Sequence, residues 1–138
     1  MSAGRVLALD YGTRRVGVAV SDPLGISAQP HSVLDGSGPG LMRDIGRLAA
    51  DLGVERIVVG LPLSLNGSEG PSAAAARRFA AEVAAATGLP VELLDERFTT
   101  VSAERVLVEA GLSGRRRRGV RDRVAAAVLL QSYLDGER

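Results

Sequence analysis

The chain has 138 residues, of which 46% are apolar, and this fits a single folded domain spanning residues 1–138. It contains no cysteine and one histidine, which excludes disulfides, thiolate zinc sites, cysteine nucleophiles and histidine-rich metal centres. The net charge is only +1, so the chain as a whole is not strongly basic.

Charge is nevertheless uneven along the chain. All 17 basic residues are arginine, and residues 114–138 hold seven arginines against three acidic residues. The first residues lead directly into an apolar, strand-like run without the pattern of a secretory leader, and no apolar stretch is long enough to cross a membrane. We therefore expect a cytoplasmic protein with no membrane partner and with a basic segment near its C-terminus.

Apolar periodicity predicts an initial group of three strands, followed by alternating helices and strands. The expected strands are 5–10, 16–20, a segment within 26–34, 56–60 and 90–94. The expected helices are 41–52, 72–87, a segment from Thr99 or Thr100 to about 110, and 120–134. An antiparallel start followed by this alternation predicts an α/β fold, a five-stranded mixed sheet flanked by helices.

Turn and cap residues separate these elements. Gly12 lies in the short link at residues 11–15 and predicts a hairpin. Ser72 is the expected N-cap of the second helix, while Gly53 and Gly88 stand where the first and second helices should end. Longer loops are expected at 61–71 and 111–119.

Three carboxylates stand where an apolar element ends or begins. Asp10 closes the apolar run 6–9, Glu96 follows the mostly apolar run 91–94, and Asp122 opens an almost wholly apolar helix. A buried carboxylate is costly unless its charge is compensated, and one divalent cation could compensate several at once. Oxygen ligands suit Mg²⁺ or Mn²⁺, so the three residues are candidate metal ligands and candidate catalytic residues.

Each carboxylate also has a purely structural interpretation. Asp10 could start a turn by bonding its own backbone, Glu96 could be a solvated strand end, and Asp122 could cap its helix. Asp95 precedes Glu96, and because neighbouring strand residues point to opposite faces, only one of the two can easily face a common site. Asp95 remains a possible fourth ligand.

The basic segment lies directly before Asp122. Arg115, Arg116, Arg117, Arg118 and Arg121 could hold a phosphate backbone beside an acidic metal site, or they could simply form a solvated face. Aromatic residues make up only 3% of the chain, which favours phosphate contacts over base stacking on an aromatic platform. Together with the acids, the segment indicates metal-assisted hydrolysis of a phosphodiester.

The chain resembles the YqgF/RuvX family over nearly its whole length. Four motifs carry the resemblance in order: the run Leu9-Asp10-Tyr11-Gly12-Thr13-Arg14-Arg15-Val16-Gly17-Val18-Ala19, the loop Gly60-Leu61-Pro62 with Asn66-Gly67, the segment Asp95-Glu96-Arg97-Phe98-Thr99-Thr100, and Asp122 with Ala125-Ala126 and Leu129-Leu130-Gln131-Ser132-Tyr133-Leu134. The resemblance implies an RNase H-like fold and a metal-dependent nuclease that trims the 5′ end of the 16S rRNA precursor. It also implies kinship with Holliday-junction resolvases.

Carried over by position, the resemblance makes Asp10, Glu96 and Asp122 the acidic ligands of Mg²⁺ or Mn²⁺, in a site for two ions. Arg14 and Arg97 join the basic segment as candidate nucleic-acid contacts. Gly12, Thr13, Asn66 and Gly67 are candidate supports of the backbone around the site. The expected partners are pre-rRNA, single-stranded or branched DNA, and ribosomal precursor particles, for a monomer or a homodimer.

Two rival functions remain open at this stage. Asp-x-Gly-Thr in a hairpin is also similar to the phosphate-binding opening of actin-like ATPases and sugar kinases, although one domain of this length does not supply their interdomain cleft. The chain could instead be a non-catalytic RNA-binding protein of ribosome assembly that keeps the nuclease fold.

Overall fold

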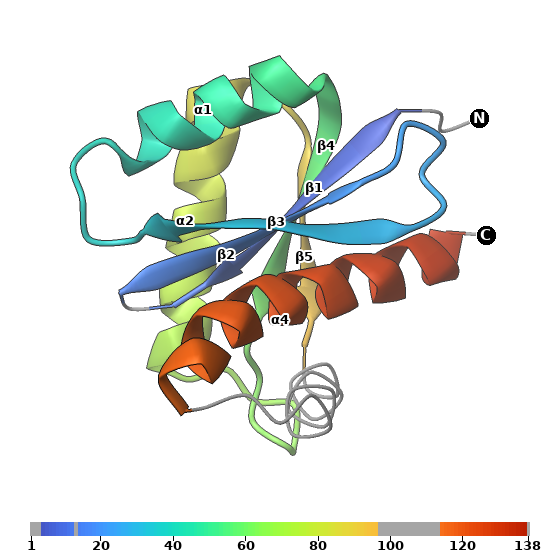
Figure 1. Ribbon diagram of the computed structural model, residues 1–138. Coiled ribbons are helices and arrows are strands. Elements are labelled where there is room, and N and C mark those ends of the chain that lie inside the picture. Colours follow the sequence, from blue (N-terminus) through green and yellow to red (C-terminus); the bar gives the residue numbers. More distant parts are fainter. Residues whose placement is uncertain (1–3, 13, 97–113, 138) are drawn as a thin grey trace.

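The computed structural model describes residues 4–12, 14–96 and 114–137, with the side chains of the last segment described from residue 123 to residue 136 (Figure 1). A five-stranded sheet forms its centre, in the spatial order β3-β2-β1-β4-β5. Its first two pairings, β1 with β2 and β2 with β3, are antiparallel, and β4 runs parallel to β1 and to β5. The strands are β1 (Arg5–Tyr11), β2 (Arg15–Ser21), β3 (Ala28–Asp35), β4 (Val54–Leu61) and β5 (Val91–Asp95). The predicted mixed α/β sheet is confirmed, with strand bounds close to those expected.

Helices cover both faces of this sheet. Figure 1 shows α1 (Leu41–Leu52) and α2 (Pro71–Thr87) on one face and α4 (Gly114–Glu137) crossing the other. The two faces have separate apolar cores, because one buried cluster includes residues of α1 and α2 and another includes residues of α4. This three-layer arrangement is the reason why β1 is apolar at consecutive positions.

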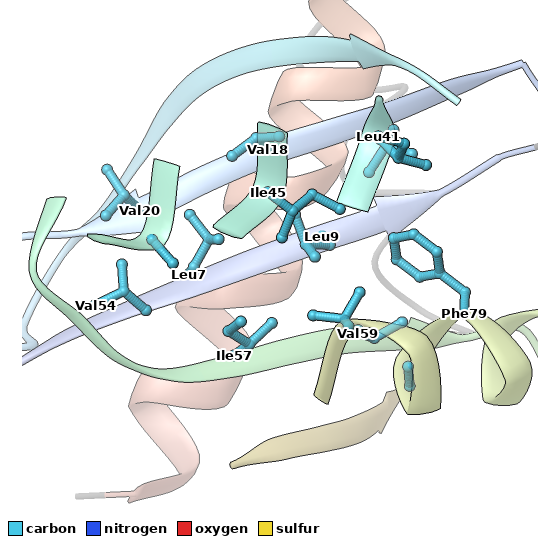
Figure 2. Packing of buried hydrophobic residues seen from close by; sticks show 14 residues of the cluster. Leu7, Leu9, Val18, Val20, Leu41, Ile45, Val54, Ile57, Val59 and Phe79 are labelled. Atoms are coloured by element: carbon cyan, nitrogen blue, oxygen red, sulfur yellow. The ribbon is translucent and has the colours of Figure 1, made fainter. Parts of the chain in front are cut away.

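Alternation along β1 assigns its side chains to the two cores. Leu7 and Leu9 pack with α1 and α2, as Figure 2 shows, whereas Val6 and Ala8 pack with α4. None of these four side chains is more than 1% exposed. The next residue, Asp10, therefore belongs to the α4 face, and Tyr11 belongs to the face of α1 and α2.

The ends of α1 and α2 follow backbone chemistry. Gly53 and Gly88 end the two helices with φ values of 66° and 72°, in the left-handed region that favours glycine, as predicted. The start of α2 was predicted wrongly, since the helix begins at Pro71 with Gly70 as its N-cap and Ser72 already inside. Proline is well suited to the first turn because its missing N–H has no helical partner there.

The basic segment also differs from its prediction. Residues 114–119 belong to α4, not to the loop predicted for residues 111–119. Arginine is a good helix former, and one glycine in a helix costs only about 1 kcal/mol, so Gly119 does not stop the helix. The helix expected from Thr99 or Thr100 lies outside the described residues. Among the described helices, none has the length and apolar character needed to span a membrane.

Candidate active site

Asp10 and Glu96 approach each other at the C-terminal end of the parallel strands. Leu9 is level with Val59, which places Asp10 beside Gly60 on the neighbouring strand β4. On the other side of β4, Gly60 is level with Leu94, and the Glu96 N–H donates to the carbonyl of Leu61 at 3.3 Å. β4 therefore lies between the two acidic residues, and both residues belong to the α4 face.

Gly60 makes the approach possible because it has no side chain. A methyl group at Gly60 would collide with the Glu96 carboxylate and would stand 3.3 Å from Cδ2 of Leu129. The Glu96 carboxylate thus occupies the space that a β-carbon would fill. A glycine within a strand often marks such a close approach, and this was the available sequence signal for a role that sequence reasoning missed.

The two carboxylates interact directly. Burial raises the pKa of Glu96 to about 8, together with the charge of Asp10, a side-chain hydrogen bond with Asp10 and the charge of Asp95. Every one of these contributions from the described part of the chain raises that pKa. Near neutral pH the pair therefore shares a proton, and it concentrates negative charge that a cation would stabilise.

Asp122 is placed by the backbone of α4, since its side chain is not among those described. α4 runs antiparallel to β4: Leu129 lies over Gly60, and the Tyr133 hydroxyl accepts a 2.9 Å hydrogen bond from Arg56 near the start of that strand. Asp122 is four residues before Ala126 and seven before Leu129, so it shares the sheet-facing side of the helix with them. It therefore stands beyond Gly60, toward the end of the sheet where Asp10 and Glu96 meet.

Asp95 takes a different position. It is exposed and follows Leu93 by two residues, and Leu93 packs against α1 and α2. Alternation along β5 therefore directs Asp95 to the face opposite Asp10 and Glu96. Among the described side chains, no group of three acids, histidines or cysteines is close enough to hold a metal ion.

The remaining candidates fall into three groups. Gly12 and Arg14 form the β1–β2 turn, where Arg14 is exposed and the Gly12 N–H donates to the Arg15 carbonyl at 2.9 Å. Asn66 and Gly67 shape the loop after β4, with Asn66 Oδ1 accepting from the Ser68 N–H at 3.0 Å. The side chains of Arg115, Arg116, Arg117, Arg118 and Arg121, together with Thr13 and Arg97, lie outside the described residues.

That loop is fastened to α2 by an ion pair that sequence reasoning also missed. The Arg77 guanidinium donates two hydrogen bonds to Glu69, at 2.7 Å to Oε1 and 2.6 Å to Oε2. The pairing holds the pKa of Glu69 below its ordinary value. The bidentate pair therefore fixes the returning arm of the loop against the helix.

Comparison with known proteins identifies the family to which this chain belongs. The family model described as "RuvX: Holliday junction resolvase" matches residues 4–136. The chain belongs to the RuvX family. RuvX relatives include a protein of Pelotomaculum thermopropionicum that is 50% identical over 96% of this chain and 88% of its own length, and one of Moorella thermoacetica that is 52% identical over 95% and 94%. Both carry the name "Putative pre-16S rRNA nuclease".

Solved structures extend the comparison to the fold. A Thermus thermophilus RuvC in complex with a Holliday junction substrate has a TM-score of 0.60 and covers 97% of this chain and 95% of its own, at 16% identity. A second Thermus thermophilus RuvC structure has a TM-score of 0.51 at 14% identity. The RuvX chain therefore has the RuvC-like, RNase H-like α/β fold.

The donor set of this RuvX site fits a hard divalent cation. Asp10 and Glu96 supply only oxygen atoms, and the backbone of α4 brings Asp122 toward the same end of the sheet. The raised pKa of Glu96 reflects burial and the nearby negative charge of Asp10, and a bound cation would favour the ionised form of both groups. A site of this kind is chemically suited to Mg²⁺ or Mn²⁺.

Proposed function

We propose that this protein is a divalent-metal-dependent nuclease that hydrolyses phosphodiester bonds, with the 5′ leader of the 16S rRNA precursor as its substrate. The observation that carries the proposal is the carboxylate pair of Asp10 and Glu96, which meets across Gly60 at the end of the parallel strands. The names of the RuvX relatives support the choice of substrate. The cytoplasm is the compartment in which we expect the protein to meet this RNA.

The residues have separate roles in this proposal. Asp10 and Glu96 hold Mg²⁺ or Mn²⁺, and Asp122 joins them from α4. Bound there, one or two ions would lower the pKa of an attacking water and stabilise the charge that develops on the phosphate. Glu96 must release its proton before it can act as a ligand, so a cation and a proton compete for this residue.

Two further features of the chain serve the substrate. The arginines in the first turns of α4 lie in the same helix as Asp122 and are suited to bidentate phosphate contacts. Leu129 and the other buried residues of α4 cover the α4 face of the sheet below the acids, which leaves the end of the sheet as the side from which we expect the substrate. The substrate backbone would therefore approach along this end.

Cleavage of three labelled substrates tests the proposal: the 5′ leader of pre-16S rRNA, single-stranded DNA and a four-way DNA junction, each with Mg²⁺ or Mn²⁺. We expect metal-dependent cleavage of the RNA by the wild type and loss of at least about 100-fold in Asp10→Asn, because one ligand of the ion is removed. Asp51→Asn, an exposed carboxylate of α1, is the matched control and should retain full activity.

The same assay separates the alternatives. Preferred cutting of the four-way junction would favour a resolvase-like DNA nuclease, the activity named in the description of the family model. Binding of the RNA by both proteins without cleavage by either would overturn the enzymatic proposal and favour an assembly protein that binds RNA.

A further inference from the structure

A cavity lies on the opposite face of the sheet from the acidic pair, but at the same end. Its volume is about 280 Å³, comparable with small ligand pockets. Residues from the end of β1, the β3–α1 loop and one side of α2 line it. Tyr11, Arg78, Phe79 and Glu82 are among the residues that line it.

An aromatic pair forms one wall of this cavity. The rings of Tyr11 and Phe79 are stacked, with centroids 4.3 Å apart and an angle of 16° between their planes. Phe79 is only 3% exposed, whereas Tyr11 is partly exposed. The buried ring therefore fixes the orientation of the tyrosine, whose ring is held ready for a flat partner at little entropic cost.

A guanidinium group lines the same cavity. Arg78 is exposed and makes no hydrogen bond or ion pair within the part of the chain that the structure describes. Its neighbour Arg77 differs in this respect, because it is engaged by Glu69. Glu82 lies one turn further along α2 and adds an acceptor to the lining. The cavity thus offers an aromatic surface, a cationic group and a hydrogen-bond acceptor.

A smaller cavity connects this region with the end of the sheet. Its volume is about 110 Å³, and its lining includes Tyr11, Gly12, Pro62 and Ala75, of which Tyr11 and Ala75 also line the larger cavity. Gly12 and Pro62 directly follow β1 and β4, the strands that carry Asp10 and Gly60. A strand with its phosphate at Asp10 could therefore pass over Gly12 and enter the larger cavity beside Tyr11.

We propose that the larger cavity binds one unpaired nucleotide of the substrate, next to the phosphodiester that is cleaved. Its base stacks on Tyr11, its phosphate pairs with Arg78, and Glu82 accepts a hydrogen bond from an amino group of the base. The low aromatic content of the chain predicted that phosphate contacts dominate substrate binding. The proposed site adds one position at which a base can stack. The proposal rests on the proposed nuclease function, because the cleaved bond must lie at Asp10.

Tyrosine fluorescence provides a direct test of the stacking. The chain has two tyrosines and no tryptophan, so Tyr133→Phe leaves Tyr11 as the only strong emitter. A single-stranded RNA hexamer is titrated into this variant in the presence of Ca²⁺, and its binding is followed separately through the anisotropy of a labelled hexamer. We expect Tyr11 emission to be quenched in parallel with binding. Binding without a change in emission would overturn the proposal that the larger cavity is a nucleotide subsite. Absence of binding would overturn both this proposal and the proposed nuclease function.

Cleavage kinetics distinguish the subsite from the nuclease itself. Arg78→Ala and Tyr11→Leu should raise KM for a single-stranded substrate by about 5-fold to 150-fold, the range expected from one lost stacking or phosphate contact, with little change in kcat. Arg47→Ala, an arginine of α1 that does not line the cavity, is the control and should leave KM unchanged. If wild type cleaves and Asp10→Asn does not, while all three variants keep the wild-type KM, the subsite is wrong and the nuclease function stands.

Discussion

Glu96 reaches Asp10 only because β4 presents no side chain at the point between them. The register of β4 fixes Gly60 beside Asp10, and the Glu96 carboxylate fills the space of the absent β-carbon. Substitution at Gly60 should therefore act on the geometry of the acids and not on any group that touches substrate. Gly60 is a positioning residue in this sense.

Gly60→Ala should lower the affinity for Mn²⁺ by at least about tenfold, because the new methyl group displaces the Glu96 carboxylate. Isothermal titration of Mn²⁺ measures this directly. Gly46→Ala is the matched control: its nearest neighbour would be 3.9 Å away, so the change should stabilise α1 by about 0.5–1 kcal/mol and leave metal binding intact. Equal Mn²⁺ affinity in Gly60→Ala and wild type would contradict the positioning role.

The raised pKa of Glu96 makes the stability of the metal-free protein depend on pH. Between the ordinary value of 4.5 and about 8, the folded chain retains a proton that the unfolded chain has released. Stability should therefore fall as pH rises through this window and level off above it. Thermal unfolding of Glu96→Gln measures how much Glu96 contributes to this pH dependence. The Tm of this variant should not fall between pH 4.5 and pH 8, and at pH 8 it should be higher than the Tm of the metal-free wild type. A parallel pH dependence in both proteins would contradict the assignment.

At the scale of elements, the basic segment belongs to the helix that carries Asp122. The sequence suggested a loop because glycine stands at both ends of the arginine run and apolar periodicity starts only at Val120. The helix of the structure continues through Gly119 because arginine favours helix and one glycine is tolerated. The backbone of the arginine run is therefore helical and continuous with that of Asp122.

Arg116→Ala combined with Arg117→Ala tests this segment. Alanine favours the helix at least as well as arginine, so the helix content measured by circular dichroism should not fall. Nucleic-acid affinity should decrease, and the slope of log K against log salt should become less steep by about one unit for each lost phosphate contact. Unchanged salt dependence would place the phosphate backbone elsewhere. Arg47→Ala again serves as the control.

At the scale of the whole molecule, the sequence predicted the sheet better than the site. The order of strands and helices was sufficient to predict a mixed sheet flanked by helices, and the structure adds that the helices cover both of its faces. The approach of Asp10 to Glu96 depends on the pairing of β1, β4 and β5, which joins residues far apart in the chain. Local sequence patterns do not contain this long-range register. The acids were therefore grouped by their chemistry and by the family resemblance.

Metal binding should also be visible in the stability of the whole molecule. An ion that binds only the folded chain stabilises it by about 2.7 kcal/mol at a hundredfold excess over Kd, which corresponds to several degrees in Tm for a chain of this size. We expect this shift with Mn²⁺ for the wild type and for Asp51→Asn, and its loss in Asp10→Asn. A shift of the same size in all three proteins would place the ion away from Asp10.

The alternation of side chains along β1 determines which residues face each side of the sheet. Asp10 and Tyr11 are neighbours in the chain, yet one belongs to the face of the acids and the other to the face of the larger cavity. One residue inserted between Val6 and Asp10 would move every β1 side chain after the insertion, including Asp10 and Tyr11, to the opposite face of the sheet. The strand should therefore tolerate substitution far better than a change of length.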